Sequence, residues 1–329
     1  MFSSNFIEIL VLQLDKRVRF MHARKLKFYA KNVIFDLVPS SIFEKRYDRM
    51  FTNLDEHQWN YIRKRADYYN KLERRFVLDE TASRSGAVPL RGNPSAYYYD
   101  LKEISRYFPR SLKFKYVFTD IKETVDEPTL LKTRPLTAAN ENSVILKLDK
   151  IRHFNFVEDT RPFHSKLDMA VFRGACYQEH RQEFVAKYHS SPLADVGDTD
   201  DLKKGQPGHR PYMSISDQLK YKFVVSLEGN DVATNLKWIM LSNSVCFMRK
   251  PKVESWFMEG SLIPEYHYVL LNDEFSDLED KINYYAKHTD KAMAIIRNAN
   301  QYAMQFLDTR REKLISLLVL KKYFDLSGQ

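Results

Sequence analysis

The chain has 329 residues and carries 52 lysines and arginines against 43 aspartates and glutamates, a formal net charge of +9 at pH 7. Hydrophobic residues make up 44% of the chain, which is enough for packed cores and excludes an intrinsically disordered protein. No apolar run reaches the roughly 18 residues of a membrane-spanning helix, and the length suits two domains of roughly 100–200 residues each. The basic balance attracts phosphate-bearing partners, which include nucleic acids, anionic lipids and phosphorylated ligands.

The first predicted element is a helical region from Phe2 to about Phe51, in which basic residues alternate with apolar ones. Two interpretations stay open for it: an amphipathic helix packed on the first domain, or a basic face that contacts anionic lipid. The starting stretch MFSSNFIEILVLQLDKR lacks the basic region and the cleavage site of a signal peptide. We therefore do not interpret it as a secretion signal.

The rest of the first half mixes helices and strands. EHQWNYIRKRADYYNKL and YYYDLKEISRYF predict helices, with a loop at residues 86–94 between them. KFKYVFTD, residues 113–120, predicts a strand that ends at Asp120. We expect residues 121–142, which contain two prolines, to be irregular, and SVILKL to form another strand.

The second half alternates strands and helices, which predicts a parallel sheet covered on both faces. MAVFRGA, FVVSL, SVCFM and EYHYVLL are the expected strands, while EHRQEFVAKYH and DLEDKINYYAKH are expected helices. DVGDTDDLKKGQPGHRP reads as a solvated surface loop, and a final helix is expected from about Asp290 to Tyr323. Neither GxGxxG nor GxxxxGK[ST] occurs, which argues against a dehydrogenase or a P-loop enzyme. The two cysteines, Cys176 and Cys246, form no metal-binding pattern, so we expect no metal site.

A ligand of such a sheet binds beyond the carboxyl ends of its strands. FRGACYQEHR lies at one such end, where Gly174 is expected to allow a sharp turn and Arg173 and Arg181 flank the next helix. Arginine forks fit phosphate oxygens, so this segment is a candidate anion site. The alternative is a pair of solvated surface arginines.

LEGNDVATNLK marks a second strand end, and the turn after SVCFM marks a third. Gly229 closes the strand, and backbone N–H groups of the following turn can meet a phosphate. Asn230, Thr234 and Asn235 add neutral donors and Lys237 adds charge, while Asp231 suits a sugar hydroxyl. The alternative is an ordinary helix start capped by Asp or Asn.

These two segments carry a resemblance to glycosyltransferase family 90. KYKFVVSLEGNDVATNLKWIMLSNSVCFMRKPKVESWFMEGSLIPEYHYVLL resembles the signature of that family, and AVFRGACYQEHR resembles its upstream arginine motif. LEGNDVATNLKW, KPKVESWFMEG and LKTRPL are most similar to the bacterial lipopolysaccharide core branch. The resemblance extends roughly from Phe114 to Asp308.

The resemblance implies an α/β fold of the GT-B type, with two Rossmann-like domains and a nucleotide-sugar cleft between them. Residues 1–150 would form an acceptor-binding domain with a basic helical start, and residues 151–305 the nucleotide-sugar domain. Residues 306–329 would form a helix packed toward the first domain. The family inverts the anomeric centre and is not built around a metal, so UDP-hexose is the expected donor and no cofactor is expected.

The resemblance also implies individual roles. Arg173, Gly174, Ala175 and Arg181 would surround the diphosphate, and Glu254 would accept from ribose or sugar hydroxyls. The loop that wraps the nucleotide would comprise Gly229, Asn230, Asp231, Val232, Ala233, Thr234 and Asn235, with Lys237 either assisting or structural. Lys132 and Arg134 would meet phosphates of the acceptor.

An inverting transfer needs one base to take the proton of the acceptor hydroxyl. Asp120 is the candidate, because TDIKETVDEP resembles the segment that carries the base in the family, and Asp126 remains the alternative. The expected function is transfer of glucose or galactose from a UDP-sugar to a heptose of the lipopolysaccharide core. The enzyme would be cytoplasmic and held peripherally at the anionic inner membrane. The competing hypothesis is a basic nucleic-acid-binding protein, motivated by aromatic and basic interleaving in HQWNYIRKRADYYNK and YFPRSLKFKY.

Overall fold

The computed structural model describes residues 16–329, with side-chain environments from residue 24 onward. The helical prediction for the N-terminal region is confirmed from Lys16, whereas the stretch interpreted as lacking a secretion signal lies largely outside the described residues. The helices of the first half are α2 (Lys16–Asp36), α3 (Ser40–Glu44), α4 (Tyr47–Met50), α5 (Glu56–Tyr69), α6 (Ser95–Ser105) and α7 (Lys150–His153). Asp55 starts α5 with a reciprocal capping box to Gln58, which satisfies two backbone donors at once.

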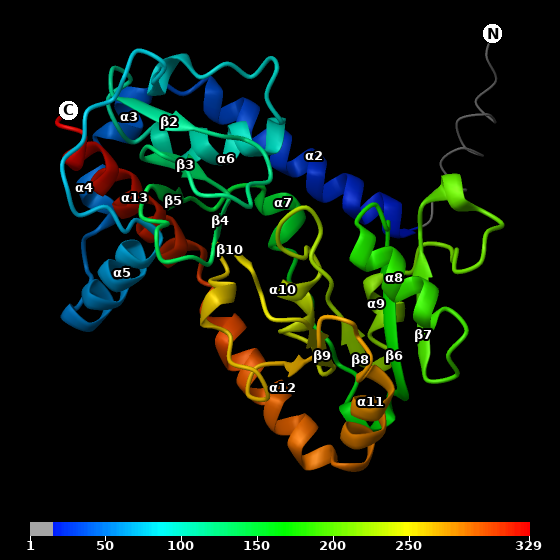
Figure 1. Cartoon of the computed structure of the whole chain (residues 1–329). Helices are drawn as coiled ribbons and strands as arrows, with labels where there is room; N and C mark the ends of the chain where they lie inside the picture. The colour runs from blue at the N-terminus through cyan, green and yellow to red at the C-terminus, as the bar shows by residue number, and fades with distance from the viewer. Residues whose placement is uncertain (1–15) are drawn as a thin grey trace, which may run out of the picture.

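The first sheet has the strand order β1-β2-β3-β5 (Figure 1). Its strands are β1 (Ser83–Arg84), β2 (Lys113–Tyr116), β3 (Thr129–Leu131) and β5 (Ser143–Ile145). β2, β3 and β5 run parallel, and β1 pairs antiparallel at the edge. The prediction that residues 121–142 are irregular is wrong for β3 and for β4 (Thr133–Pro135). Pro128 directly precedes β3, and Pro135 is the last residue of β4. At these positions the missing backbone N–H donor of proline costs little.

The second sheet is parallel throughout and has the order β11-β9-β8-β6-β7. Its strands are β6 (Leu167–Gly174), β7 (Ala194–Asp198), β8 (Tyr221–Val225), β9 (Val245–Met248) and β11 (Val269–Leu270). The helices of this half are α8 (Glu179–Tyr188), α9 (Ile215–Gln218), α10 (Leu236–Ile239), α11 (Leu278–Lys287) and α12 (Thr289–Met304). β8 and β9 are buried because helices pack on the sheet, among them α8 on β7 and α12 on β9. This arrangement confirms the predicted α/β class with a parallel sheet.

Two expectations for this half are wrong. The polar stretch predicted as a surface loop begins with β7, and Asp198 at its end is buried and paired with Lys203 rather than solvated. The expected single final helix is two helices, α12 and α13 (Thr309–Leu326), separated where the Asp308 side chain accepts from the backbone of Arg311 and starts the second. α13 packs against α5 and α6 of the first half (Figure 1).

Aromatic and basic residues of α5 pack inward. Tyr69 stacks on Trp256 with ring centroids 3.8 Å apart, and Arg65 forms a buried ion pair with Glu312. Tyr107 and the neighbouring aromatic of the second interleaved segment are also buried. The interleaving that suggested nucleic-acid stacking is therefore core packing.

A two-stranded antiparallel sheet joins the two halves of the chain. It pairs β4 with β10 (Val253–Ser255) and aligns Arg134 with Glu254. The Arg134 guanidinium forms an ion pair with the Glu254 carboxylate at 2.8 Å, and both side chains are fully buried. Remaining guanidinium donors bond to the backbone oxygens of Tyr68 and Tyr69. Because each charge has several partners, the pair can exist inside the core.

Short 3₁₀ turns complete the described chain: η1 (Ser85–Ala87), η2 (Phe163–Ser165), η3 (Asp201–Lys203) and η4 (Glu259–Ser261). Among residues 16–329, no helix combines the length and apolar character that crossing a bilayer requires. The same residues contain no cluster of three or more His, Cys, Asp or Glu side chains arranged to hold a metal ion.

We predict that Glu254→Gln lowers the free energy of unfolding by about 3 to 5 kcal/mol, because it leaves the Arg134 charge buried without its partner. Urea unfolding followed by circular dichroism measures this change. Lys321→Met is the matched control: it breaks an exposed ion pair with Asp325 and should cost less than about 0.5 kcal/mol. Equal effects of the two substitutions would contradict a structural role for the buried pair.

Candidate active site

The candidate site lies at the point of the second sheet where the order of the strands along the chain reverses. β6 and β8 are neighbours in the sheet, although β7 separates them in sequence and lies on the outer side of β6. In open α/β sheets, this is the point at which the loops after adjacent strands diverge and leave space for a ligand. The loops after β6 and β8 contain the two segments that the sequence singled out.

Arg181 of α8 fastens these two loops together. Its guanidinium donates to the backbone oxygens of Ala175 at 3.0 Å, Leu227 at 2.7 Å and Glu228 at 3.0 Å. Burial lowers the pKa of Arg181, and charged neighbours oppose that shift. Arg181 is therefore first of all a clamp between loops, and only the donors it does not use here are left for a ligand.

The two glycines of the motifs lie beside this clamp but do not act as predicted. Neither Gly174 nor Gly229 has a positive φ angle, so the chain turns there without the backbone freedom that glycine offers. A side chain added at Gly229 would lie 3.5 Å from the Arg181 guanidinium, at ordinary contact distance.

A pocket of about 230 Å³ opens beside this clamp. Its lining residues are Lys122, His180, Ser226, Glu228, Gly229, Asp231, Val232, Ala233, Leu236, Met248, Arg249, Pro251, Lys252, Val253 and Glu259. The lining combines apolar side chains, such as Val232 and Met248, with basic side chains and with three carboxylates. Such a mixture suits a flat ring next to a polar group.

Four basic lining residues were not singled out from the sequence: Arg249, His180, Lys252 and Lys122. Arg249 follows β9 and forms an ion pair with Glu228, while its Nε, which is buried, has no hydrogen-bond partner. His180 contacts the backbone oxygen of Glu228 at 2.9 Å, and burial lowers its pKa. Lys252 is exposed at the rim. The turn after SVCFM was noted as a candidate segment, and its basic residues were the available signal.

Lys122 also lines the pocket and comes from the first half of the chain. It follows Asp120, so the segment after β2 reaches the pocket built by the second sheet. Both halves of the chain thus contribute to this site.

Asp120 and Asp231 meet at Lys132. The Lys132 ammonium forms an ion pair with each of the two carboxylates, at 2.6 Å for Asp231. Thr133 donates a hydrogen bond to Asp231 at 3.1 Å, and Tyr97 of α6 donates to Asp120 at 3.5 Å. Asp120 is 29% exposed, whereas Asp231 is 4% exposed, so an incoming molecule can reach Asp120 and not Asp231.

The shared ammonium separates the two carboxylates in acidity. Burial raises the pKa of Asp120, but its hydrogen bond and ion pair with Lys132 outweigh burial, so the pKa is lowered overall. Burial also raises the pKa of Asp231, and there the cation does not compensate fully. Asp231 and Asp120 in turn raise the pKa of Lys132 against the effect of its burial. Asp120 is therefore the ionised and accessible carboxylate of the cluster.

A second, deeper layer was missed by the sequence interpretation. Asp149 is buried, and burial raises its pKa to about 6, with Asp120 and Asp231 adding to the shift. His153 lies 3.9 Å from Asp149, and neither of its ring nitrogens has a hydrogen-bond partner. Isolated acids and histidines in a sequence carry no signal of this proximity.

Several predicted ligand contacts prove to be internal contacts. The prediction that Arg134 binds acceptor phosphates is wrong, because its guanidinium is fully buried on Glu254. The role predicted for Glu254 is corrected as well, because its carboxylate oxygens accept hydrogen bonds from Arg134 and from the Tyr68 hydroxyl. Lys237 is also corrected: it is buried, and its ammonium bonds to Glu259 at 2.7 Å, which supports the structural alternative.

Three more candidates form hydrogen bonds or ion pairs with other residues of the protein. Arg173 donates to the backbone oxygen of Asp195 at 2.7 Å and forms an ion pair with its carboxylate, so it points toward β7. Asn235 closes the loop after β8 through hydrogen bonds with Ser226 and the Val225 oxygen. Lys132, expected to meet acceptor phosphates, is buried between two carboxylates.

The remaining candidates stay near the pocket. Val232 and Ala233 line it, Thr234 is exposed, and Asn230 is exposed and accepts a hydrogen bond from Gln178 at 2.9 Å.

Asp126, the alternative base, is exposed on the segment before β3, and its backbone oxygen accepts a hydrogen bond from Asn142. The geometry therefore favours Asp120 over Asp126 as the carboxylate of the site.

Comparisons with known proteins identify the family of the chain. The family model described as Glycosyl transferase family 90 matches residues 144–327. O-glucosyltransferase LpsA of Dichelobacter nodosus is 44% identical over 309 residues, which cover 92% of this chain and 96% of that protein. Protein O-glucosyltransferase 3 of Homo sapiens is 28% identical over 165 residues, which cover 48% of this chain and 32% of that protein.

We predict that Arg181→Ala costs about 2 to 4 kcal/mol of unfolding free energy, because three backbone oxygens lose a charged donor. Hydrogen exchange of the amides in residues 226–231 should accelerate well beyond the global change. Arg297→Ala, on the exposed face of α12, is the control and should change neither quantity. Unchanged exchange in the loop would show that Arg181 is not its clamp.

Proposed function

Because the chain belongs to glycosyl transferase family 90, we propose that it transfers a hexose, glucose or galactose, from a UDP-sugar to a heptose of the lipopolysaccharide inner core. Glycosyl transfer follows from the family, and the name of the bacterial relative favours glucose. The heptose acceptor is supported by the motifs that resemble the lipopolysaccharide branch.

We propose a GT-B-like division with residues 1–150 as the acceptor domain, residues 151–305 as the nucleotide-sugar domain and residues 306–329 as a returning helix. The support is that the described chain forms two separate sheets with parallel strands and that residues from both halves line the pocket. The packing of α13 on α5 and α6 agrees with the returning helix.

The proposed donor site is the pocket beside the Arg181 clamp. Its apolar lining residues, among them Val232, Ala233 and Met248, would receive the uracil ring, and Glu228 would accept from hydroxyls. Arg249, Lys252 and Lys122 would balance the charge that develops on the diphosphate as the hexose leaves. This mechanism assigns charge stabilisation to these side chains and needs no metal.

Asp120 is the proposed base, and its meeting with the loop after β8 is the observation that carries the proposal. Its pKa is lowered, it is partly exposed, and it shares Lys132 with Asp231, which lines the pocket. It would take the proton of the acceptor hydroxyl as that oxygen attacks the anomeric carbon from the face opposite UDP. The bond from that carbon to the diphosphate oxygen breaks, and the configuration inverts.

The enzyme is proposed to work peripherally at the cytoplasmic face of the inner membrane, where its acceptor is anchored. The nucleic-acid alternative has no support from the comparisons, and several of the aromatic side chains that suggested it, Tyr69, Tyr107, Phe108 and Phe114, are buried.

We predict that the purified protein turns over UDP-glucose or UDP-galactose with a truncated core oligosaccharide, measured as UDP release and product mass. Asp120→Asn should reduce turnover by roughly 10²–10⁴-fold, because proton removal is lost, while UDP affinity stays within about twofold. Asp126→Asn is the matched control and should retain activity.

Absence of transfer, of donor hydrolysis and of UDP binding in the wild-type protein would overturn the proposed function. Retained activity of Asp120→Asn together with lost activity of Asp126→Asn would move the base to the alternative aspartate.

We predict a pH effect of Lys132. The pKa of Asp120 is lowered in the folded protein, so the base is already ionised at pH 5 and above and its protonation limits kcat/KM only at lower pH. Lys132→Gln removes the cation while burial and Asp231 remain, so the acidic limb of kcat/KM should move up by roughly one to two pH units. Lys321→Gln is the control, and an unshifted limb in Lys132→Gln would exclude this electrostatic role.

A further inference from the structure

One face of α2 exposes an unusual row of apolar side chains. Leu26 is 71% exposed, Val33 51%, Ile34 61% and Leu37 81%. Leu26, Val33 and Ile34 lie on one side of α2, and Leu37, the residue directly after the helix, continues their row. We call these four residues the α2 stripe. No other helix among residues 24–329 exposes as many large apolar side chains.

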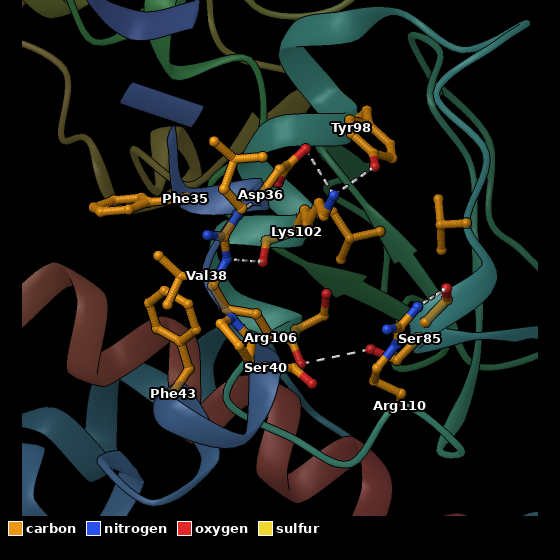
Figure 2. Close-up of a pocket in the computed structure, with 16 residues that line it drawn as sticks. Phe35, Asp36, Val38, Ser40, Phe43, Ser85, Tyr98, Lys102, Arg106 and Arg110 are labelled. Carbon is orange, nitrogen blue, oxygen red and sulfur yellow. Dashed lines mark hydrogen bonds and ion pairs between the residues drawn. The ribbon is translucent and has the colours of Figure 1, made fainter. Parts of the chain in front are cut away.

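The opposite side of α2 is fixed to the protein. Figure 2 shows Lys102 of α6 bonded to Asp36 and to the Tyr98 hydroxyl, at 2.8 Å and 2.9 Å. The Arg106 guanidinium lies over the rings of Phe35 and Phe43, 5.5 Å and 5.0 Å from their centroids. These contacts hold the helix in one rotation, so the stripe is turned outward by packing.

Other buried contacts act at the start of the helix. Arg24 donates to Asn155 and to the backbone oxygen of Ile151, and Tyr29 bonds to Ser95 at 2.9 Å. The helix is therefore anchored along most of its described length. The stripe cannot turn inward without breaking these partners.

The pocket next to the end of the stripe, about 300 Å³ in volume, is not itself the binding site (Figure 2). Of its cations, Lys102 is held by Asp36, Arg106 donates to the Lys102 backbone oxygen at 3.0 Å, and Arg110 donates to Gly86 at 3.0 Å. Each of these three cations therefore has at least one partner within the protein, although Nη1 and Nη2 of Arg106 are buried without a hydrogen-bond partner.

The stripe is flanked by exposed positive charge. Lys25 and Lys27 are exposed on α2, Lys45 directly follows α3, and Arg49 lies on α4. Lys31 is also exposed, but it forms an ion pair with Glu103. Apolar side chains bordered by lysines match the boundary of a bilayer, where acyl chains lie under anionic phosphates. The same arrangement disfavours a second copy of the chain, because two such lysine rows would repel each other.

We propose that the α2 stripe is the surface by which this protein docks on an anionic membrane, with Leu26, Val33, Ile34 and Leu37 in the interface and the lysines on lipid phosphates. The choice of a membrane as occupant rests on the proposed function, in which the acceptor is lipid-anchored. The surface itself takes no part in the transfer reaction.

The test is sedimentation of the full-length protein with lipid vesicles. One set of vesicles contains phosphatidylcholine alone, and the other contains roughly 30% phosphatidylglycerol, so that the two sets differ in negative charge. The wild type should bind the anionic vesicles and release in high salt. The double substitution Leu26→Glu with Leu37→Glu should lower the partition coefficient at least about tenfold, because apolar insertion is replaced by repulsion. Lys25→Gln with Lys27→Gln should lower it about tenfold on anionic vesicles only.

The matched controls are Val77→Glu with Leu202→Glu, at exposed apolar positions elsewhere, and Lys204→Gln with Lys287→Gln, at exposed lysines elsewhere. Both should bind as the wild type does. Wild-type protein that stays unbound, or a stripe variant that binds normally, would overturn the proposal. So would a wild-type dimer, seen by analytical ultracentrifugation, that the stripe substitutions dissociate without any effect on vesicle binding.

Transfer to a soluble core oligosaccharide separates this proposal from the proposed function. The Leu26→Glu, Leu37→Glu variant should keep full activity on that acceptor. Vesicle binding without any transfer by the wild type would remove the proposed activity and leave the docking surface in place.

Discussion

The buried ion pair between Arg134 and Glu254 is the contact on which the site depends. It fixes β4 against β10, and these two short strands are where the first sheet's half of the chain is joined to the second. Lys132 immediately precedes β4, so its position is set by the same pairing. Without that alignment, the ammonium could not stand between a carboxylate of one half and a carboxylate of the other.

The charge arrangement at Lys132 shifts the pKa values of two similar acids in opposite directions. One cation serves two carboxylates, and its attraction outweighs burial at Asp120 but not at Asp231. Exposure accounts for the difference, because Asp120 keeps solvent access and Asp231 does not. Lys132, which the sequence analysis expected to meet acceptor phosphates, is thus an electrostatic partner of two carboxylates inside the protein.

The sequence predicted the parts with regular patterns. Apolar runs marked β8 and β9, and the signature motifs marked the loops that meet at Arg181. It failed where pairing across long distances decides the structure. β4 and β10 are short and polar, and each buries a charge only because the other supplies its counterpart. The roles expected for Arg134, Glu254 and Lys237 failed for this reason, since a charged residue in a sequence does not reveal a buried partner.

The two faces of α6 connect distant parts of the molecule. Tyr97 contacts Asp120, while Lys102, which also bonds to the Tyr98 hydroxyl, holds α2 through Asp36. If α2 lies flat on a bilayer, α6, a helix about 10 Å thick, lies between the lipid-bound element and Asp120, the proposed base. Docking would then fix the distance between the membrane and the carboxylate. A sugar too near to the lipid, or too far along the oligosaccharide, would not reach the carboxylate even if its hydroxyl groups were suitable acceptors. Chain position of the acceptor would be selected by height above the membrane as well as by sugar recognition.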